Sequence, residues 1–172
     1  MAIESYLEFV PKLADDVFVA QSADLIGRVT LKEKASVWYN ATLRGDINEI
    51  VVGAYSNVQD NAVLHLSDDL PCLIGDFVTV GHSAIVHAAT VENGVLVGMG
   101  AIILDGSVIG ENSVVGAGAL VTGNMIVPPN SLVLGSPAKV VRTLGLEEQR
   151  MGRDLAEKYV QQSRKFLARE AN

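Results

Sequence analysis

The chain contains three histidines, and all of them fall within one short window: His65, His82 and His87. Sixteen residues separate the first two and four separate the last two. Three neutral imidazoles leave a divalent ion its full charge and an open coordination position, which is how a catalytic rather than a structural zinc site is built. The three residues therefore predict a metal centre, provided that the fold brings their rings together.

A hexapeptide period determines where these side chains lie. Aliphatic residues recur every six positions, which neither a long alternating strand nor a helix of 3.6-residue period explains. Three units, each a short strand and a turn, make one triangular coil of about eighteen residues, so we expect an all-β solenoid, a parallel β-helix. The interior positions are Leu31, Val37, Leu43, Val52, Val58, Leu64, Ile74, Val80, Val86, Val91, Val97, Ile103, Ile109, Val115, Val121, Val127 and Val133.

The period is interrupted at three places. Three extra residues follow Leu43, four follow Leu64, and one is missing between Val86 and Val91. If successive coils are aligned on their aliphatic positions, both insertions leave the solenoid at the same corner. We expect the two loops to border one site on the outside of the solenoid.

The same alignment stacks two of the histidines. His65 follows Leu64 and His87 follows Val86, and these aliphatic residues hold equivalent places in consecutive coils. Neighbouring strands lie about 4.8 Å apart, so the two rings should point the same way, one coil apart. That spacing suits two nitrogens bound to one ion at about 2.0–2.1 Å.

His82 is expected on a separate face of the prism, at a different edge from the other two histidines. It lies two residues after Val80, and Asp60 lies two residues after Val58, so Asp60 should stack on His82. Arg44 follows Leu43 directly, so it should stack on the column of His65 and His87. Joining the two edges from neighbouring subunits pairs Arg44 with Asp60 and completes a three-histidine site. Because this contact is heterologous and closes into a ring, the sequence predicts a homotrimer.

The pattern changes after the repeat. We expect a β-helix domain over residues 1–143, with an N-terminal cap over about 1–25, and a C-terminal amphipathic helix over residues 144–172 that packs along the solenoid. Trp38 starts outside the prism and should lie in an interface or under that helix. The expected apolar stripe of the helix consists of Met151, Leu155, Tyr159 and Phe166.

Composition excludes several classes of partner. The net charge is −7 and the 13 Lys and Arg residues are scattered, which argues against nucleic acid. Residues 112–138 carry no charge, but glycines and prolines interrupt them too often for a membrane span. The start of the chain has no signal-peptide pattern and Cys72 is the single cysteine, so we expect a cytoplasmic protein in which Cys72 is a small buried apolar group.

These motifs together resemble the gamma-class carbonic anhydrases and their close relatives, which are left-handed β-helix trimers. The resemblance runs over nearly the whole chain, and the spacing of the histidines is its most specific part. The matching segments are Ile26-Gly27, Leu43-Arg44-Gly45-Asp46, Asn57-Val58-Gln59-Asp60-Asn61, His65, Ile74-Gly75, Val80-Gly81-His82, Val86-His87 and Gly135-Ser136-Pro137-Ala138-Lys139.

The resemblance implies a role for each matching residue. It implies that His65 and His87 bind the metal from one subunit and that His82 comes from the next. It further implies that Arg44, Asp46 and Asp60 hold the trimer and that Gln59 lies close to the metal-bound water. Tyr159 matches a tyrosine that the family's C-terminal helix brings to the site, and it equally fits the packing stripe.

Two positions depart from the family pattern. Well-characterised members carry a glutamate after the Arg-Gly-Asp segment, where this chain has Ile47. They also carry an acidic proton-export loop after the first histidine, which here is the short segment 66–71. Asp68 or Asp69 would replace that function only by pointing at the metal; otherwise both belong to a solvated turn.

The expected activity is the reversible hydration of CO2 to bicarbonate by a metal-bound hydroxide at a trimer interface. Zinc is the expected cofactor, and imidazole ligands also suit iron(II) or cobalt. One alternative is an acyl-CoA thioesterase that uses the same metal site, and another is a non-catalytic, metal-bearing trimeric assembly subunit. An acetyltransferase of the same solenoid class needs one histidine as general base rather than three at metal spacing.

Overall fold

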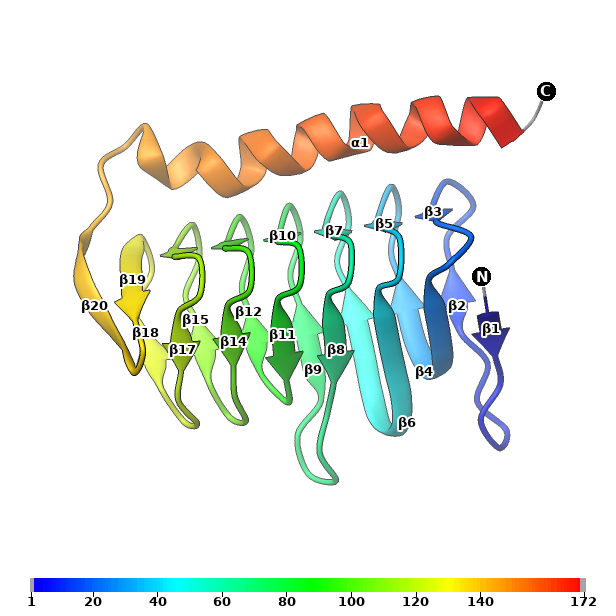
Figure 1. Ribbon diagram of the computed structural model, residues 1–172, viewed down its shortest axis with the longest axis horizontal. Coiled ribbons are helices and arrows are strands. Elements are labelled where there is room, and N and C mark those ends of the chain that lie inside the picture. Colours follow the sequence, from blue (N-terminus) through cyan, green and yellow to red (C-terminus); the bar gives the residue numbers. More distant parts are fainter. Residues whose placement is uncertain (1, 171–172) are drawn as a thin grey trace.

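The computed structural model describes residues 2–170, and the parts of the expected domains at residues 1 and 171–172 lie outside the described residues. Short strands stack in parallel along one axis to form a β-solenoid, and a single long helix runs along its side (Figure 1). The predicted fold class, a parallel β-helix of hexapeptide units with a C-terminal helix packed along it, is confirmed. Among the described residues no helix is long and apolar enough to cross a membrane.

Two sheets form the three faces of the prism. The first sheet covers two faces, because β6 pairs with β8 near its start and with β9 near its end. Its strands are β1 (Ala2–Glu4), β2 (Lys12–Leu13), β4 (Asp24–Leu31), β6 (Thr42–Val52), β8 (Val63–His65), β9 (Cys72–Ile74), β11 (Ile85–His87), β12 (Thr90–Val91), β14 (Ile102–Ile103), β15 (Val108–Ile109), β17 (Leu120–Val121) and β18 (Ile126–Val127).

The second sheet forms the third face. Its neighbouring strands are parallel except for the last pair, in which β20 turns back antiparallel on β19 and ends the repeat. The strands are β3 (Phe18–Val19), β5 (Ser36–Val37), β7 (Asn57–Val58), β10 (Thr79–Val80), β13 (Leu96–Val97), β16 (Val114–Val115), β19 (Ser131–Gly135) and β20 (Ala138–Thr143).

The core is the column of aliphatic residues that the period of six predicts. All seventeen predicted interior positions are buried, and none is more than 2% exposed. Cys72 is also buried, as expected, and burial raises the pKa of its thiol to about 12. The thiol is therefore protonated and unreactive at neutral pH.

The ends of the solenoid differ from the expected boundaries. Leu13 pairs with Leu31 and Val19 pairs with Val37, so the repeat already begins within the segment 1–25 that was expected to cap it. At the other end, a short 3-10 helix η1 (Glu148–Arg150) precedes helix α1 (Met151–Glu170), which starts later than residue 144.

Helix α1 packs on the second sheet through small residues. Gly152, Ala156 and Ser163 are buried, and a Cβ on Gly152 would collide with the backbone carbonyl of Gly94. Met151, expected in the apolar stripe, is instead 46% exposed. The close approach of the helix to the solenoid backbone depends on small residues such as Gly152, which an apolar stripe of large residues does not include.

Trp38 anchors the C-terminal half of the helix. Its ring lies 5.1 Å from Phe18, 5.3 Å from Tyr159 and 5.3 Å from Phe166, measured between centroids. The last two contacts are edge-on, at 80° and 88°, a favoured arrangement of aromatic rings. The prediction that Trp38 lies under the helix is confirmed.

Replacing Trp38 by alanine should therefore loosen helix α1. We expect the Trp38→Ala variant to lose about 3–5 kcal/mol of unfolding free energy, because it leaves a cavity among three aromatic rings. Urea denaturation measures this loss. Leu146→Ala, at a side chain that is 83% exposed, is the control and should change the unfolding free energy by less than about 0.5 kcal/mol. Equal stability of the two variants would contradict the anchoring role.

Candidate metal centre

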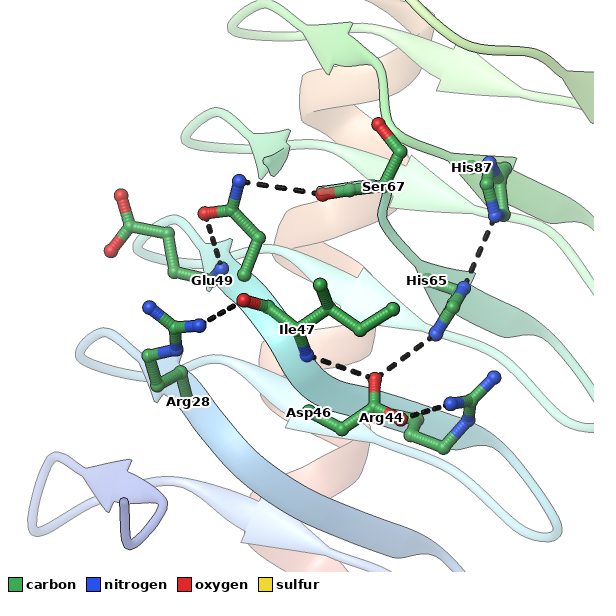
Figure 2. Close-up of polar contacts among 9 residues, drawn as sticks. Arg28, Arg44, Asp46, Ile47, Glu49, His65, Ser67 and His87 are labelled. Atoms are coloured by element: carbon green, nitrogen blue, oxygen red, sulfur yellow. Dashed lines mark hydrogen bonds and ion pairs between the residues drawn. The ribbon is translucent and has the colours of Figure 1, made fainter. Parts of the chain in front are cut away.

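The two insertions meet at one corner of the prism, as their positions in the repeat predict. The first is an exposed extension within β6, and the second is the loop between β8 and β9 (Figure 2). The side-chain amide of Asn48 joins them, donating to the carbonyl oxygens of Ser67 at 3.4 Å and Asp68 at 3.2 Å. These loops border the place where β8 and β11 end.

His65 and His87 lie side by side at that corner. They are paired residues of the parallel strands β8 and β11, which confirms the predicted stacking. Their ring centroids are 5.1 Å apart, and Nδ1 of His65 lies 3.1 Å from Nε2 of His87 (Figure 2). Both side chains are partly buried, at 14% and 33% exposure.

A carboxylate lies at the outer nitrogen of each ring. Asp46 Oδ1 is 3.2 Å from Nε2 of His65, and Asp105 Oδ1 is 2.6 Å from Nδ1 of His87. An ionised carboxylate only accepts hydrogen bonds, so each outer nitrogen carries the ring's hydrogen. In two neutral rings the inner nitrogens then present lone pairs to each other, an arrangement that a cation between them would stabilise.

The electrostatics around His65 and Asp46 favour a neutral ring beside a charged carboxylate. Partial burial opposes the ionisation of Asp46, but hydrogen bonds from His65 and Arg44 outweigh it and hold the pKa of the carboxyl below its usual value. Burial lowers the pKa of the His65 imidazole, against the opposing hydrogen bond of Asp46. Asp46 is therefore charged and His65 neutral at pH 7, and the neutral ring is the form that binds a metal.

The pair fits the requirements of a shared metal ion. Two imidazole nitrogens on one tetrahedral zinc ion, each at about 2.0–2.1 Å, lie about 3.3 Å from each other. The observed 3.1 Å differs from this by a small movement of the rings. Within the described part of the chain, no group of three His, Cys, Asp or Glu side chains is placed to hold a metal.

His82 lies at the opposite edge of the β11 face, so its predicted place on an edge other than that of His87 is confirmed, whereas the separate face expected for it is not. It belongs to the turn before β11, so the width of that strand separates it from His87. Its Nδ1 is 2.8 Å from Oδ2 of Asp60, which confirms that these two residues stack. Their side chains are 39% and 33% exposed, so both are accessible to a second chain.

Arg44 belongs to the edge that carries the histidine pair. Its guanidinium forms an ion pair with Asp46 of the same chain, and its side chain is 46% exposed (Figure 2). Asp60, its predicted partner, lies at the other edge beside His82. A contact between Arg44 and Asp60 therefore needs two subunits and stays a prediction.

Gln59 and Tyr159 lie near the edge that carries His82 and Asp60. Gln59 is 3% exposed, and its side-chain Nε2 donates to Oδ1 of Asn57 at 3.2 Å, which fixes the carboxamide. Tyr159 and Asp60 line one hollow of about 520 Å³ between helix α1 and the solenoid. Burial and, after it, the charge of Asp60 raise the pKa of Tyr159, so its hydroxyl is protonated at neutral pH.

Sequence reasoning missed Asp105, although the repeat contains a signal for it. Ile103 pairs with Val86, so Leu104 takes the position equivalent to His87, and Asp105 follows one residue later. The missing residue between Val86 and Val91 shortens the turn after His87. The backbone N–H of Gly106 then donates to the carbonyl of Ala88 at 2.8 Å, which brings the carboxylate to the ring.

The acidic loop takes the form of a solvated turn. Asp68 and Asp69 are exposed, and the backbone N–H of Ser67 closes the turn on the carbonyl of Leu70 at 3.1 Å. Ile47 is 44% exposed, and its carbonyl accepts a hydrogen bond from Arg28 (Figure 2).

Comparisons with known proteins agree with this architecture. The family model described as "Bacterial transferase hexapeptide (six repeats)" matches residues 88–123. The "Probable carbonic anhydrase" of Methanocaldococcus jannaschii is 53% identical over 151 residues, covering 88% of this chain and 95% of that protein. The "Carbonic anhydrase" of Geobacillus kaustophilus is 43% identical over 166 residues, covering 96% of this chain and 91% of that protein. A hexapeptide transferase family protein from Anaplasma phagocytophilum superimposes with a TM-score of 0.92 at 40% identity, covering 96% of this chain and 98% of that one.

Proposed function

The chain belongs to the gamma-class carbonic anhydrase family, and from this membership we propose that it hydrates CO2 reversibly to bicarbonate at a divalent metal held between subunits of a homotrimer. The observation that supports the metal site is the pair of imidazoles whose inner nitrogens face each other at 3.1 Å while carboxylates take the outer N–H groups. This pair is two thirds of a three-imidazole zinc site.

In this proposal His65 and His87 hold the metal from one subunit, and His82 of a neighbouring subunit completes the site. When bound, a divalent ion such as zinc lowers the pKa of a water ligand to about 7 and so supplies a hydroxide nucleophile at neutral pH. Zinc is the proposed metal, and iron(II) and cobalt suit the same ligands.

The chain's other residues orient these ligands and the substrate. Asp46 and Asp60 each accept a hydrogen bond from one of the histidines, and the pairing of Arg44 with Asp60 of the neighbour joins the two edges. Gln59 precedes Asp60 and its carboxamide is held by Asn57, so it is suited to orient the attacking oxygen. Tyr159 packs on Trp38 and lines the hollow beside Asp60, where it can border the substrate's path.

Hydrolysis of an acyl-CoA thioester at the same metal is the second candidate. It is favoured by the likeness to a hexapeptide transferase family protein, which covers nearly the whole chain. Both candidates use the same ligands, so the substrate distinguishes them. The third alternative is a metal-bearing trimer without catalytic activity. It would be indicated if the protein binds metal but neither CO2 nor the thioester reacts.

One set of measurements on the purified protein tests the proposal. We expect about one zinc or iron ion per subunit, a trimer by light scattering, and CO2 hydration that chelation abolishes and added zinc restores. A monomer with bound zinc would refute the shared site. Hydrolysis of acetyl-CoA without CO2 hydration would replace the proposed reaction by the second candidate.

A further inference from the structure

We infer that Asp105 is a positioning residue of the metal centre, which holds His87 in the tautomer that keeps Nε2 free to bind a metal. The inference extends the proposed function, since it explains how one of its ligands is prepared. It concerns a residue outside the family motifs that identify the other members of the site.

The contact is short, and the backbone around it is fixed. Asp105 Oδ1 lies 2.6 Å from Nδ1 of His87, within the range of a charge-assisted hydrogen bond. Asp105 belongs to the turn after β14, the strand that pairs with β11. Gly106 next to it adopts a φ of +71°, a left-handed conformation that glycine allows without strain. Because Gly106 also donates to Ala88, the turn holds the carboxylate against the ring.

The position of this hydrogen bond selects the nitrogen that faces the metal. A neutral imidazole carries its hydrogen on one nitrogen only, and the partner of that nitrogen decides which one it is. Asp105 accepts the hydrogen of Nδ1, so the lone pair of Nε2 points toward His65. Without the carboxylate, the hydrogen can move to Nε2 and block the ligand position. Partners of this kind typically change metal affinity by about 10–100-fold.

The test compares Asp105→Ala and Asp105→Asn with the wild-type protein. We expect Asp105→Ala to weaken zinc binding by about 10–100-fold in a chelator competition while the trimer and its circular dichroism stay unchanged. Asp105→Asn keeps an acceptor without the charge, so it should recover part of the affinity. Nitrogen NMR of the histidine rings in the metal-free protein should show Nδ1–H on His87 in the wild type and a loss of this tautomer in Asp105→Ala.

Asp76→Ala is the matched control. The Asp76 carboxylate also bridges two coils, accepting the backbone N–H of Ala54 at 2.8 Å, but it touches none of the histidines. We expect it to lower thermal stability and to leave zinc affinity unchanged. Wild-type zinc affinity in Asp105→Ala, an unchanged His87 tautomer, or an equal loss of affinity in Asp76→Ala would overturn the inference. The tautomer is read without metal or substrate, so a failure of the proposed reaction would not affect this test.

Discussion

Reversing the charge at Arg44 is expected to dissociate the trimer, and reversing Asp60 in the same chain is expected to restore it. Arg44→Asp places a carboxylate opposite Asp60 of the neighbouring subunit, and Asp60→Arg places two guanidinium groups opposite each other. Each single change brings two like charges together at the interface, where loss of the partner of a buried charge alone costs about 3–5 kcal/mol. The double variant recreates an opposite pair at every interface of the ring.

Sedimentation velocity across a range of protein concentrations measures the assembly. Arg142→Asp is the control, because Arg142 pairs with Glu148 of its own chain at 2.6 Å. It should sediment as the wild type does. Metal content is the wrong readout here, since Asp60 also contacts His82 and its loss disturbs a ligand. Dissociation of the double variant to the same degree as the single ones would show that Arg44 and Asp60 do not pair.

The stacked columns could be predicted from the sequence because, in a solenoid, the number of residues between two positions determines whether their side chains stack. Once Leu64 and Val86 occupy equivalent places, His65 and His87 must lie on adjacent strands, and the structure confirms this pairing. The same arithmetic places Asp60 against His82, where the two side chains form a 2.8 Å contact. Few folds allow such inference, since most bring distant residues together through packing that no period describes.

What the repeat does not determine is the direction of side chains in its turns. Asp105 contacts His87 only because a shortened turn and the left-handed conformation of Gly106 aim it there. For helix α1, the predicted contacts of Tyr159 and Phe166 are found, but the buried positions of Gly152 and Ala156 were not predicted, because these small residues contribute close approach rather than apolar area. These features depend on backbone detail that a period of six does not encode.

The division of ligands between chains leads to the second large effect, a complementation between two inactive variants. His65→Ala and His82→Ala should each lose the metal, because two imidazoles hold zinc too weakly. The defects lie on opposite edges of the subunit, since the pair at the end of β8 and β11 is separated from His82 by one face of the prism. Each variant therefore keeps intact the edge that the other lacks.

Refolding the two variants together should restore part of the metal site. Each site needs the paired edge of one chain and His82 of the next, so a ring of mixed composition contains one intact interface and two defective ones. Random mixing of equal amounts should then recover about one quarter of the wild-type metal content, with activity in proportion, whereas either variant refolded alone should recover none. Metal analysis measures the recovery, and native mass spectrometry establishes that mixed trimers form. Mixed trimers that bind no metal would show that the three histidines do not form a site shared between chains.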